Sequence, residues 1–168
     1  MVFSGGEPTY QRGLPEAAVA IRSMGFDVAV HTNGYSADAL GRLLAGGAVS
    51  YVAMDVKARF EQYERVTRVP GSGRGPEDCV RLLTASGVAH EFRTTYHPGL
   101  LSLQDIRRIA LALHSLGARA YRIQAFRQEG CLDAALRNCP QSAAALPGSL
   151  LDELGALFPR FGLRGFAD

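Results

Sequence analysis

Polar residues and glycines follow several apolar runs in this chain, and these are the residues whose types suit chemistry. In chain order the groups are GGEP at 5–8, HTNG at 31–34, DVK at 55–57, RTTYHP at 93–98 and QAFR at 124–127. Each group comes directly after a run with the composition of a β-strand. If the strands are parallel, their polar ends meet at one edge of a sheet, where ligands bind in such folds.

The first group suits a ligand that carries a positive charge. Gly5 and Gly6 let a ligand approach the backbone, because glycine has no Cβ, and Glu7 then offers an acceptor to a cation. Pro8 ends the group. A simple tight turn with an exposed Glu7 explains the same residues, so both interpretations stay open at this point.

Asp55 and Lys57 lie two residues apart in the stretch YVAMDVKA. In a strand this spacing places both side chains on one face. Two charges in an apolar stretch must be paired or bound to something, because their desolvation is costly. The pair is therefore either a structural ion pair or a site for a ligand with both an amine and a carboxylate.

The histidines and cysteines do not predict a metal site. His31 could act as a base, a metal ligand or a packing residue, and the other histidines have no metal-ligand spacing. The three cysteines, Cys79, Cys131 and Cys139, form no CxxC pair, and a sparse odd count argues against a disulfide scaffold. The segment GSGRG at 71–75 lacks the strand and the GK[ST] ending of a phosphate loop.

The elements that position these groups alternate between strand and helix patterns. We expect strands over residues 2–4, 26–32, 49–56, 89–96 and 120–126, and helices over 15–24, 37–44, 76–85, 103–116 and 149–158. The nearly continuous apolar strands are typical of a parallel sheet buried on both faces. The pattern predicts an α/β fold, a partial (β/α) TIM-like barrel with about five β/α units and right-handed crossovers.

Local signals mark where these helices begin and end. Gly25, Gly46, Gly87 and Gly117 are expected as left-handed helix C-caps, and the stretch 102–105 resembles a capping box. Two stretches interrupt the alternation: 68–76, RVPGSGRGP, is expected to be a mobile loop, and 130–148 a surface excursion of low order.

Length and composition bound the class of protein. The chain has 168 residues, 47% hydrophobic and 20% charged, which suits a single domain over 1–168 with a sizeable core. The net charge of +2, from 18 basic and 16 acidic side chains, is too balanced to favour a nucleic-acid or membrane surface. We expect a cytoplasmic location, since the cysteines favour a reducing compartment and no signal-peptide pattern is found.

Taken in order, VFSGGEPT, HTNG, YVAMDVKA and FRTTYHPG resemble the radical S-adenosylmethionine (SAM) superfamily. Within it they resemble the glycyl-radical-enzyme activases, above all the anaerobic ribonucleoside-triphosphate reductase activating proteins. GGEP is the superfamily motif that holds the amino group of SAM, and TNG and DxK are activase features. The resemblance covers residues 2 to about 127.

The resemblance implies a SAM site and assigns residues to it. These are Gly5, Gly6, Glu7, Pro8, Thr32, Asn33, Asp55, Lys57, Arg93 and Arg127. GGEP would engage the amino group, the TN pair would line the pocket, and DVK would handle the methionine carboxylate, with or without a monovalent cation. Activases often have Asp before TNG, whereas this chain has His31.

The resemblance also implies a 4Fe–4S cluster, held by a CxxxCxxC motif upstream of GGEP that leaves one iron open for SAM. Here only Met1 stands before Val2, and the three cysteines have the wrong spacing. We therefore expect a fragment that lacks the first β/α unit, and no activity from this chain alone. In the family, the reduced cluster cleaves SAM, and the resulting 5′-deoxyadenosyl radical removes a hydrogen atom from a glycine of the partner enzyme.

The implied partners are a glycyl radical enzyme, such as an anaerobic ribonucleotide reductase, and a flavodoxin or ferredoxin as electron donor. Three alternatives remain. One is a radical SAM enzyme like 7-carboxy-7-deazaguanine synthase, acting on a small molecule; another is a non-catalytic module that binds SAM or the partner; the third is a different β/α enzyme that acts without SAM. We expect an unprotected sheet edge at residues 2–4, and with it weak stability or association.

Overall fold

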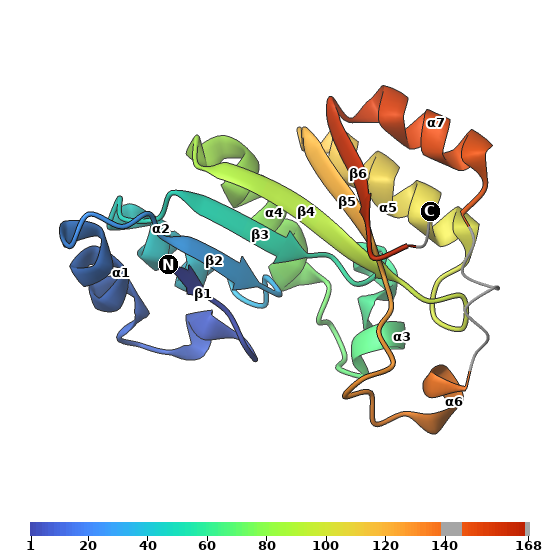
Figure 1. The fold of residues 1–168 in the computed structure, drawn as a ribbon, viewed down its shortest axis with the longest axis horizontal. Helices are drawn as coiled ribbons and strands as arrows, with labels where there is room; N and C mark the ends of the chain where they lie inside the picture. The colour runs from blue at the N-terminus through green and yellow to red at the C-terminus, as the bar shows by residue number, and fades with distance from the viewer. Residues whose placement is uncertain (139–145, 167–168) are drawn as a thin grey trace.

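The computed structural model describes residues 1–138 and 146–166. Its described part holds one six-stranded sheet in which every neighbouring pair is parallel and the spatial order follows the chain. The strands are β1 (Val2–Phe3), β2 (Ala29–Thr32), β3 (Tyr51–Asp55), β4 (Ala89–Tyr96), β5 (Ala120–Ala125) and β6 (Arg160–Arg164). This singly wound order (Figure 1) confirms the predicted partial (β/α) barrel.

Helices connect the strands and cover one face of the sheet (Figure 1). They are α1 (Leu14–Ser23), α2 (Ala37–Ala45), α3 (Tyr63–Thr67), α4 (Arg74–Ser86), α5 (Leu103–Ser115), α6 (Ala134–Arg137) and α7 (Gly148–Leu157), with 3-10 turns η1 (Pro8–Tyr10) and η2 (Phe60–Gln62). Helix α2 packs on α4, and α5 packs on α7. None of the helices in the described ranges has the length and apolar character that crossing a bilayer requires.

The two faces of the sheet differ in chemistry. On the helix side Val30 is aligned with Val52, and Phe92 with Met54 and Tyr121, and all five are fully buried in the hydrophobic core. On the other side, the register aligns charged residues instead, with Asp55 beside Arg93 and Arg93 beside Arg122. Our expectation of strands with two apolar faces was wrong. Apolar residues stand next to these charged residues along each strand, so the sequence pattern does not reveal the charged row.

Most predicted elements are confirmed with shifted ends. The strand at 89–96 is found unchanged, and the other four are shorter than predicted. Strand β6 was missed because RFGLR has two arginines and a glycine and offers little strand pattern. The capping box is confirmed: the Ser102 hydroxyl accepts the Asp105 amide, and the Asp105 carboxylate accepts the Ser102 amide.

Three local expectations need correction. Arg74 and Gly75 belong to the first turn of α4, whereas we expected a loop through residue 76. Gly75 suits this turn because a Cβ there would lie 2.2 Å from the Tyr35 carbonyl oxygen. After α2, the left-handed residue is Gly47, with φ +65°, and Gly46 is right-handed. Within 130–148, α6 is found, and residues 139–145 lie outside the described ranges.

Candidate functional site

Glu7 is the centre of a hydrogen-bond network that joins the first two strand ends. Its Oε1 accepts the Thr9 amide (3.1 Å), the Thr9 hydroxyl (2.5 Å) and the Thr32 hydroxyl (2.7 Å). Its Oε2 accepts the Asn33 amide (2.6 Å). Glu7 is only 8% exposed, so the interpretation as an exposed turn glutamate is wrong. One carboxylate therefore fixes the glycine loop against the end of β2.

The two glycines before Glu7 are left open by this arrangement. Gly5 has φ +90° and Gly6 has φ +53°, conformations that residues with a side chain rarely adopt. A Cβ built on either would meet no atom within 4 Å. The surrounding space would admit a side chain, so glycine is required here by the backbone conformation and not by packing. The loop leaves its amide and carbonyl groups accessible to a ligand. Pro8 is buried at the start of η1 and fixes the exit of the loop.

The TNG group turns the chain tightly after β2. The Thr32 hydroxyl accepts the Gly34 amide (3.0 Å), and the Asn33 side chain accepts the Tyr35 amide (3.0 Å). Gly34 has φ +68° and accepts a hydrogen bond from the thiol of Cys79 (3.2 Å) at its carbonyl oxygen. The turn thus uses most of its polar groups internally, and it places Thr32 and Asn33 directly against Glu7.

Asp55 ends β3 on the charged face, and its carboxylate has no hydrogen bond or ion pair with any residue that the structure describes. Burial raises the pKa of this carboxyl, although Arg93, Lys57 and His31 oppose the effect. Lys57 is exposed and lies beyond the end of β3. The interpretation as a structural ion pair between Asp55 and Lys57 therefore finds no support in the described residues.

The backbone around Val56 is held from both sides. The hydroxyl of the buried Tyr63 accepts the Lys57 amide (2.9 Å) and donates to the Asp55 carbonyl (3.3 Å). From β4, the Thr94 hydroxyl donates to the Val56 carbonyl (2.8 Å). Sequence reasoning missed Tyr63 and Thr94, since neither belongs to a recognisable motif. Together they fix where Asp55 and Lys57 lie.

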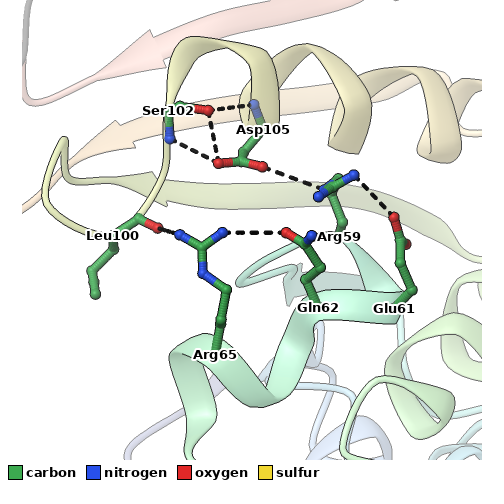
Figure 2. Close-up of polar contacts among 7 residues, drawn as sticks. All are labelled: Arg59, Glu61, Gln62, Arg65, Leu100, Ser102 and Asp105. Carbon is green, nitrogen blue, oxygen red and sulfur yellow. Dashed lines mark hydrogen bonds and ion pairs between the residues drawn. The ribbon is translucent and has the colours of Figure 1, made fainter.

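The segment that follows is tied to the start of α5 (Figure 2). The Arg59 guanidinium forms ion pairs with Asp105 (3.3 Å) and Glu61 (3.2 Å). One helical turn further, Arg65 donates to Gln62 (3.3 Å) and to the Leu100 carbonyl (3.5 Å). Because Asp105 also completes the capping box, one carboxylate links the loop after β3 to the helix after β4.

Arg93 is not a free donor for a ligand, because its guanidinium forms an ion pair with Glu91. Its Nε lies 2.5 Å from the Glu91 carboxylate, which also contacts Arg122 (3.4 Å). Burial raises the pKa of Glu91, but Arg93 outweighs that effect and holds the pKa below its ordinary value. Glu91 and Arg122 were missed because neither falls at a strand end.

His31 lies on the same face, half-buried, with Nδ1 3.4 Å from the Ser4 hydroxyl. Burial and the charge of Arg93 lower the pKa of its imidazole, which favours the neutral form. Arg127 lies apart from this group. It is exposed and lines a pocket of about 370 Å³ at the ends of β4, β5 and β6. The structure thus brings together the groups after β1, β2 and β3, whereas Arg127 belongs to a second place on the sheet edge.

The described residues do not fit an iron–sulfur cluster. No group of three or more His, Cys, Asp or Glu side chains among them could hold a metal ion. The buried Cys79 thiol donates its hydrogen to the Gly34 carbonyl, and burial raises its pKa to about 12, which favours the thiol over the thiolate. Cys131 lies far along the chain beyond β5, and Cys139 lies outside the described ranges.

The parallel, singly wound sheet, with an open glycine loop and polar strand ends at one edge, defines a partial β/α-barrel domain with a candidate ligand site. The model of the radical SAM superfamily matches residues 1–113, more than half of the chain. This chain therefore belongs to the radical SAM superfamily, as the motifs indicate. Membership implies the chemistry of SAM and a 4Fe–4S cluster.

Relatives and solved structures agree with this assignment. A provisionally named glycyl-radical enzyme activating enzyme of Methanocaldococcus jannaschii is 30% identical over 145 residues, 83% of this chain. The chain spans 60% of the length of that relative. A domain of pyruvate-formate lyase-activating enzyme from Bacteroides vulgatus has the same fold, with a TM-score of 0.74, 14% identity, and coverage of 99% of this chain and 98% of that domain.

The fold also matches SuiB of Streptococcus suis in a crystal structure bound to SAM. The TM-score is 0.64 and the identity 11%, over 98% of this chain and 37% of that one. Identity this low supports the fold alone. The predicted fold class and the superfamily are thus confirmed by independent comparisons.

Proposed function

We propose that this chain is the SAM-binding part of a radical SAM activating enzyme, which generates a glycyl radical on a partner such as an anaerobic ribonucleotide reductase. One observation carries the proposal: an open glycine loop, a fixed Glu7 and an unpaired, largely desolvated Asp55 share one end of the sheet. Glu7 and Asp55 would attract an ammonium, and Lys57, two residues beyond Asp55, would attract a carboxylate. The methionine end of SAM carries both groups.

Each residue of this set has a distinct task in the proposal. Gly5 and Gly6 present backbone groups to the ammonium, with Glu7 beneath them. Glu7 Oε2 accepts one hydrogen bond in the described structure, so it keeps capacity for a second donor. Asp55 and Lys57 handle the carboxylate end, the aspartate through a monovalent cation, and Thr32 and Asn33 position the loop.

The radical chemistry needs a cluster, and we propose that its thiolate ligands come from outside the described residues. The described part supplies binding, orientation and water exclusion for SAM. We further propose a flavodoxin or ferredoxin as the electron donor, and a cytoplasmic location, on the basis of the superfamily chemistry.

Calorimetry tests the SAM site without any cluster. The purified chain should bind SAM saturably, and it should bind methylthioadenosine at least about tenfold more weakly, because that compound lacks the amino-acid end that the site recognises. Equal binding of the two compounds, or no binding of SAM, would contradict the proposal. S-adenosylhomocysteine serves as the matched ligand that keeps the amino-acid end.

A non-catalytic SAM-binding module is a second candidate, favoured by the lack of a cluster-ligand set in the described residues. Anaerobic reconstitution with iron and sulfide separates the two. A 4Fe–4S signal with 5′-deoxyadenosine production by this chain alone would overturn both the module and our expectation that the chain is inactive alone. For the activase, a glycyl radical enzyme incubated with the complete protein should gain an electron-paramagnetic signal.

A further inference from the structure

The ends of β4, β5 and β6 form a second polar site on the sheet edge. The pocket there has a volume of about 370 Å³ and is lined chiefly by Thr95, Gln124, Ala125, Phe126, Arg127 and Arg164. Two of these residues are arginines and none is acidic. Neither the proposed SAM site nor the structural network around Glu91 includes this pocket.

The strand register places the arginines of this region in adjacent rows on one face. Gln124 is aligned with Thr95 on one side and with Arg164 on the other. The row below it aligns Arg122 with Gly162. A Cβ on Gly162 would lie 3.3 Å from Arg122 Nη1, so this glycine leaves room for the guanidinium over the sheet. Positive charge therefore extends across two rows.

The charges here do not balance. Glu91, with a single negative charge, forms ion pairs with both Arg93 and Arg122. Arg127 and Arg164 have no ion pair and no side-chain hydrogen bond within the described ranges, 1–138 and 146–166. The neighbouring Gln124 amide donates to the Thr95 hydroxyl (2.8 Å), so the two guanidinium groups are the charged donors of the described lining that have no partner there.

The pocket shares the charged face with the SAM site. Burial and Arg93 lower the pKa of His31, and the charge of Arg164 on β6 adds to this effect. The β2 and β6 ends are therefore close enough to interact electrostatically. A molecule held at the pocket would therefore lie on the same face of the sheet as the proposed SAM site.

We propose that Arg127 and Arg164 bind an oxyanion, a carboxylate or a phosphate, carried by the molecule that receives the radical. Guanidinium groups match both anions through paired N–H donors, and a pocket whose described lining holds no acid favours them. The identification of this molecule as the radical acceptor rests on the proposed function. The anion site itself rests only on the pocket and its charge.

Nuclear magnetic resonance of the arginine Nε–H groups tests the anion site in the ¹⁵N-labelled chain. Titration with succinate or with inorganic phosphate should shift the Arg127 and Arg164 signals saturably. The double variant Arg127→Gln/Arg164→Gln should weaken the response of the remaining pocket signals at least about tenfold. Saturation with succinate alone assigns a carboxylate, and with phosphate alone a phosphate. No saturable shift with either would overturn the proposal.

Arg12→Gln/Arg42→Gln is the matched control, since these arginines are also exposed and without a partner in the described structure, but line a different pocket. If this control variant weakens the anion response equally, the effect comes from net charge alone, and the proposed anion site is overturned. SAM affinity of the Arg127/Arg164 variant, by calorimetry, should stay within about threefold of the parent. A tenfold loss of SAM affinity would assign the pocket to SAM and would overturn the proposal that it binds the radical acceptor. If the anions shift the arginine signals but SAM does not bind, the anion site is supported and the proposed function is contradicted.

Discussion

At the scale of single residues, Glu7 and Asp55 show how two carboxylates on one face come to differ. Glu7 accepts four hydrogen bonds and is fixed by them, whereas Asp55 has none from the described residues and is strongly desolvated. A satisfied carboxylate positions a loop. A desolvated and unpaired one destabilises the fold and is retained where it meets a ligand.

This contrast predicts opposite effects of Asp55→Asn on stability and on binding. Burial raises the pKa of Asp55 above its unfolded value near 3.8, so the ionised form disfavours the folded state at neutral pH. The variant should unfold at higher urea concentration than the parent at pH 7. The gain should vanish below about pH 3.8, where both states of the parent are protonated.

The same variant should bind SAM at least about tenfold more weakly at pH 7, because a charge-assisted contact contributes roughly 1.5–3 kcal/mol. Asp152→Asn, on the exposed surface of α7, is the control and should change neither quantity. A destabilised Asp55→Asn protein would show that this carboxylate is structurally required, and it would contradict the argument.

At the scale of elements, the ends of the strands are held by side chains from elements that follow them. Tyr63 on α3 fixes the end of β3, Cys79 on α4 contacts the turn after β2, and Asp105 on α5 is paired with Arg59. The helices therefore do more than cover the sheet. They determine the positions of the loops on which the site residues lie.

Removing the Tyr63 hydroxyl tests this dependence. Tyr63→Phe leaves the Lys57 amide without its acceptor and should lower the free energy of unfolding by about 1–3 kcal/mol, the cost of an unsatisfied buried donor. Amide exchange at Lys57 should accelerate in parallel. Tyr10→Phe, with a ring that is 62% exposed, should have no such effect. Unchanged exchange at Lys57 in the Tyr63 variant would show that water replaces the hydroxyl.

The TNG turn gives a second test at this scale. Gly34→Ala requires alanine at φ +68° with its Cβ 2.2 Å from Met54 Cε, so it should cost about 1–3 kcal/mol of stability. Gly155→Ala in α7 meets no atom within 4 Å and should instead stabilise the chain by roughly 0.5–1 kcal/mol. Urea titrations of both variants measure the contrast. Equal midpoints would contradict the assigned role of Gly34.

At the scale of the whole molecule, β1 lies at the edge of the sheet, as expected from the sequence. Its Val2 is 53% exposed, and Val19, Met24 and Phe26, on or just after α1, are exposed as well. A free strand edge beside apolar side chains favours pairing with another chain. The opposite part of the sheet differs, since basic residues dominate the ends of β5 and β6.

We therefore expect the chain to self-associate through the β1 edge. Sedimentation velocity should show a mass that rises with concentration, and Val2→Lys should weaken the association at least about tenfold, because burying one valine contributes roughly 1.5–3 kcal/mol. Leu132→Lys removes an even more exposed side chain, 96% accessible, away from the edge, and should leave the association unchanged. A concentration-independent monomer would contradict the prediction.

The sequence by itself determined the order of the elements and the parallel sheet, and it supplied the motifs from which the site is proposed. Periodicity marks five strands and five helices, and GGEP, TNG and DVK identify the superfamily, because strand composition, glycine turns and caps are local properties. It could not supply β6, whose residues carry little strand pattern, or the short helices α3 and α6. Nor could it distinguish a strand with two apolar faces from one with a charged row.

Only the tertiary structure decided which polar residues are partners. Glu91 takes Arg93 into an ion pair, Tyr63 and Thr94 hold the Asp55 segment, and Asp55 itself remains unpaired among the described residues. It also separated Arg127 from the glycine loop and placed it beside Arg164. The physical reason is that these relations follow from strand register and from the burial of side chains distant in the chain, neither of which a local pattern contains.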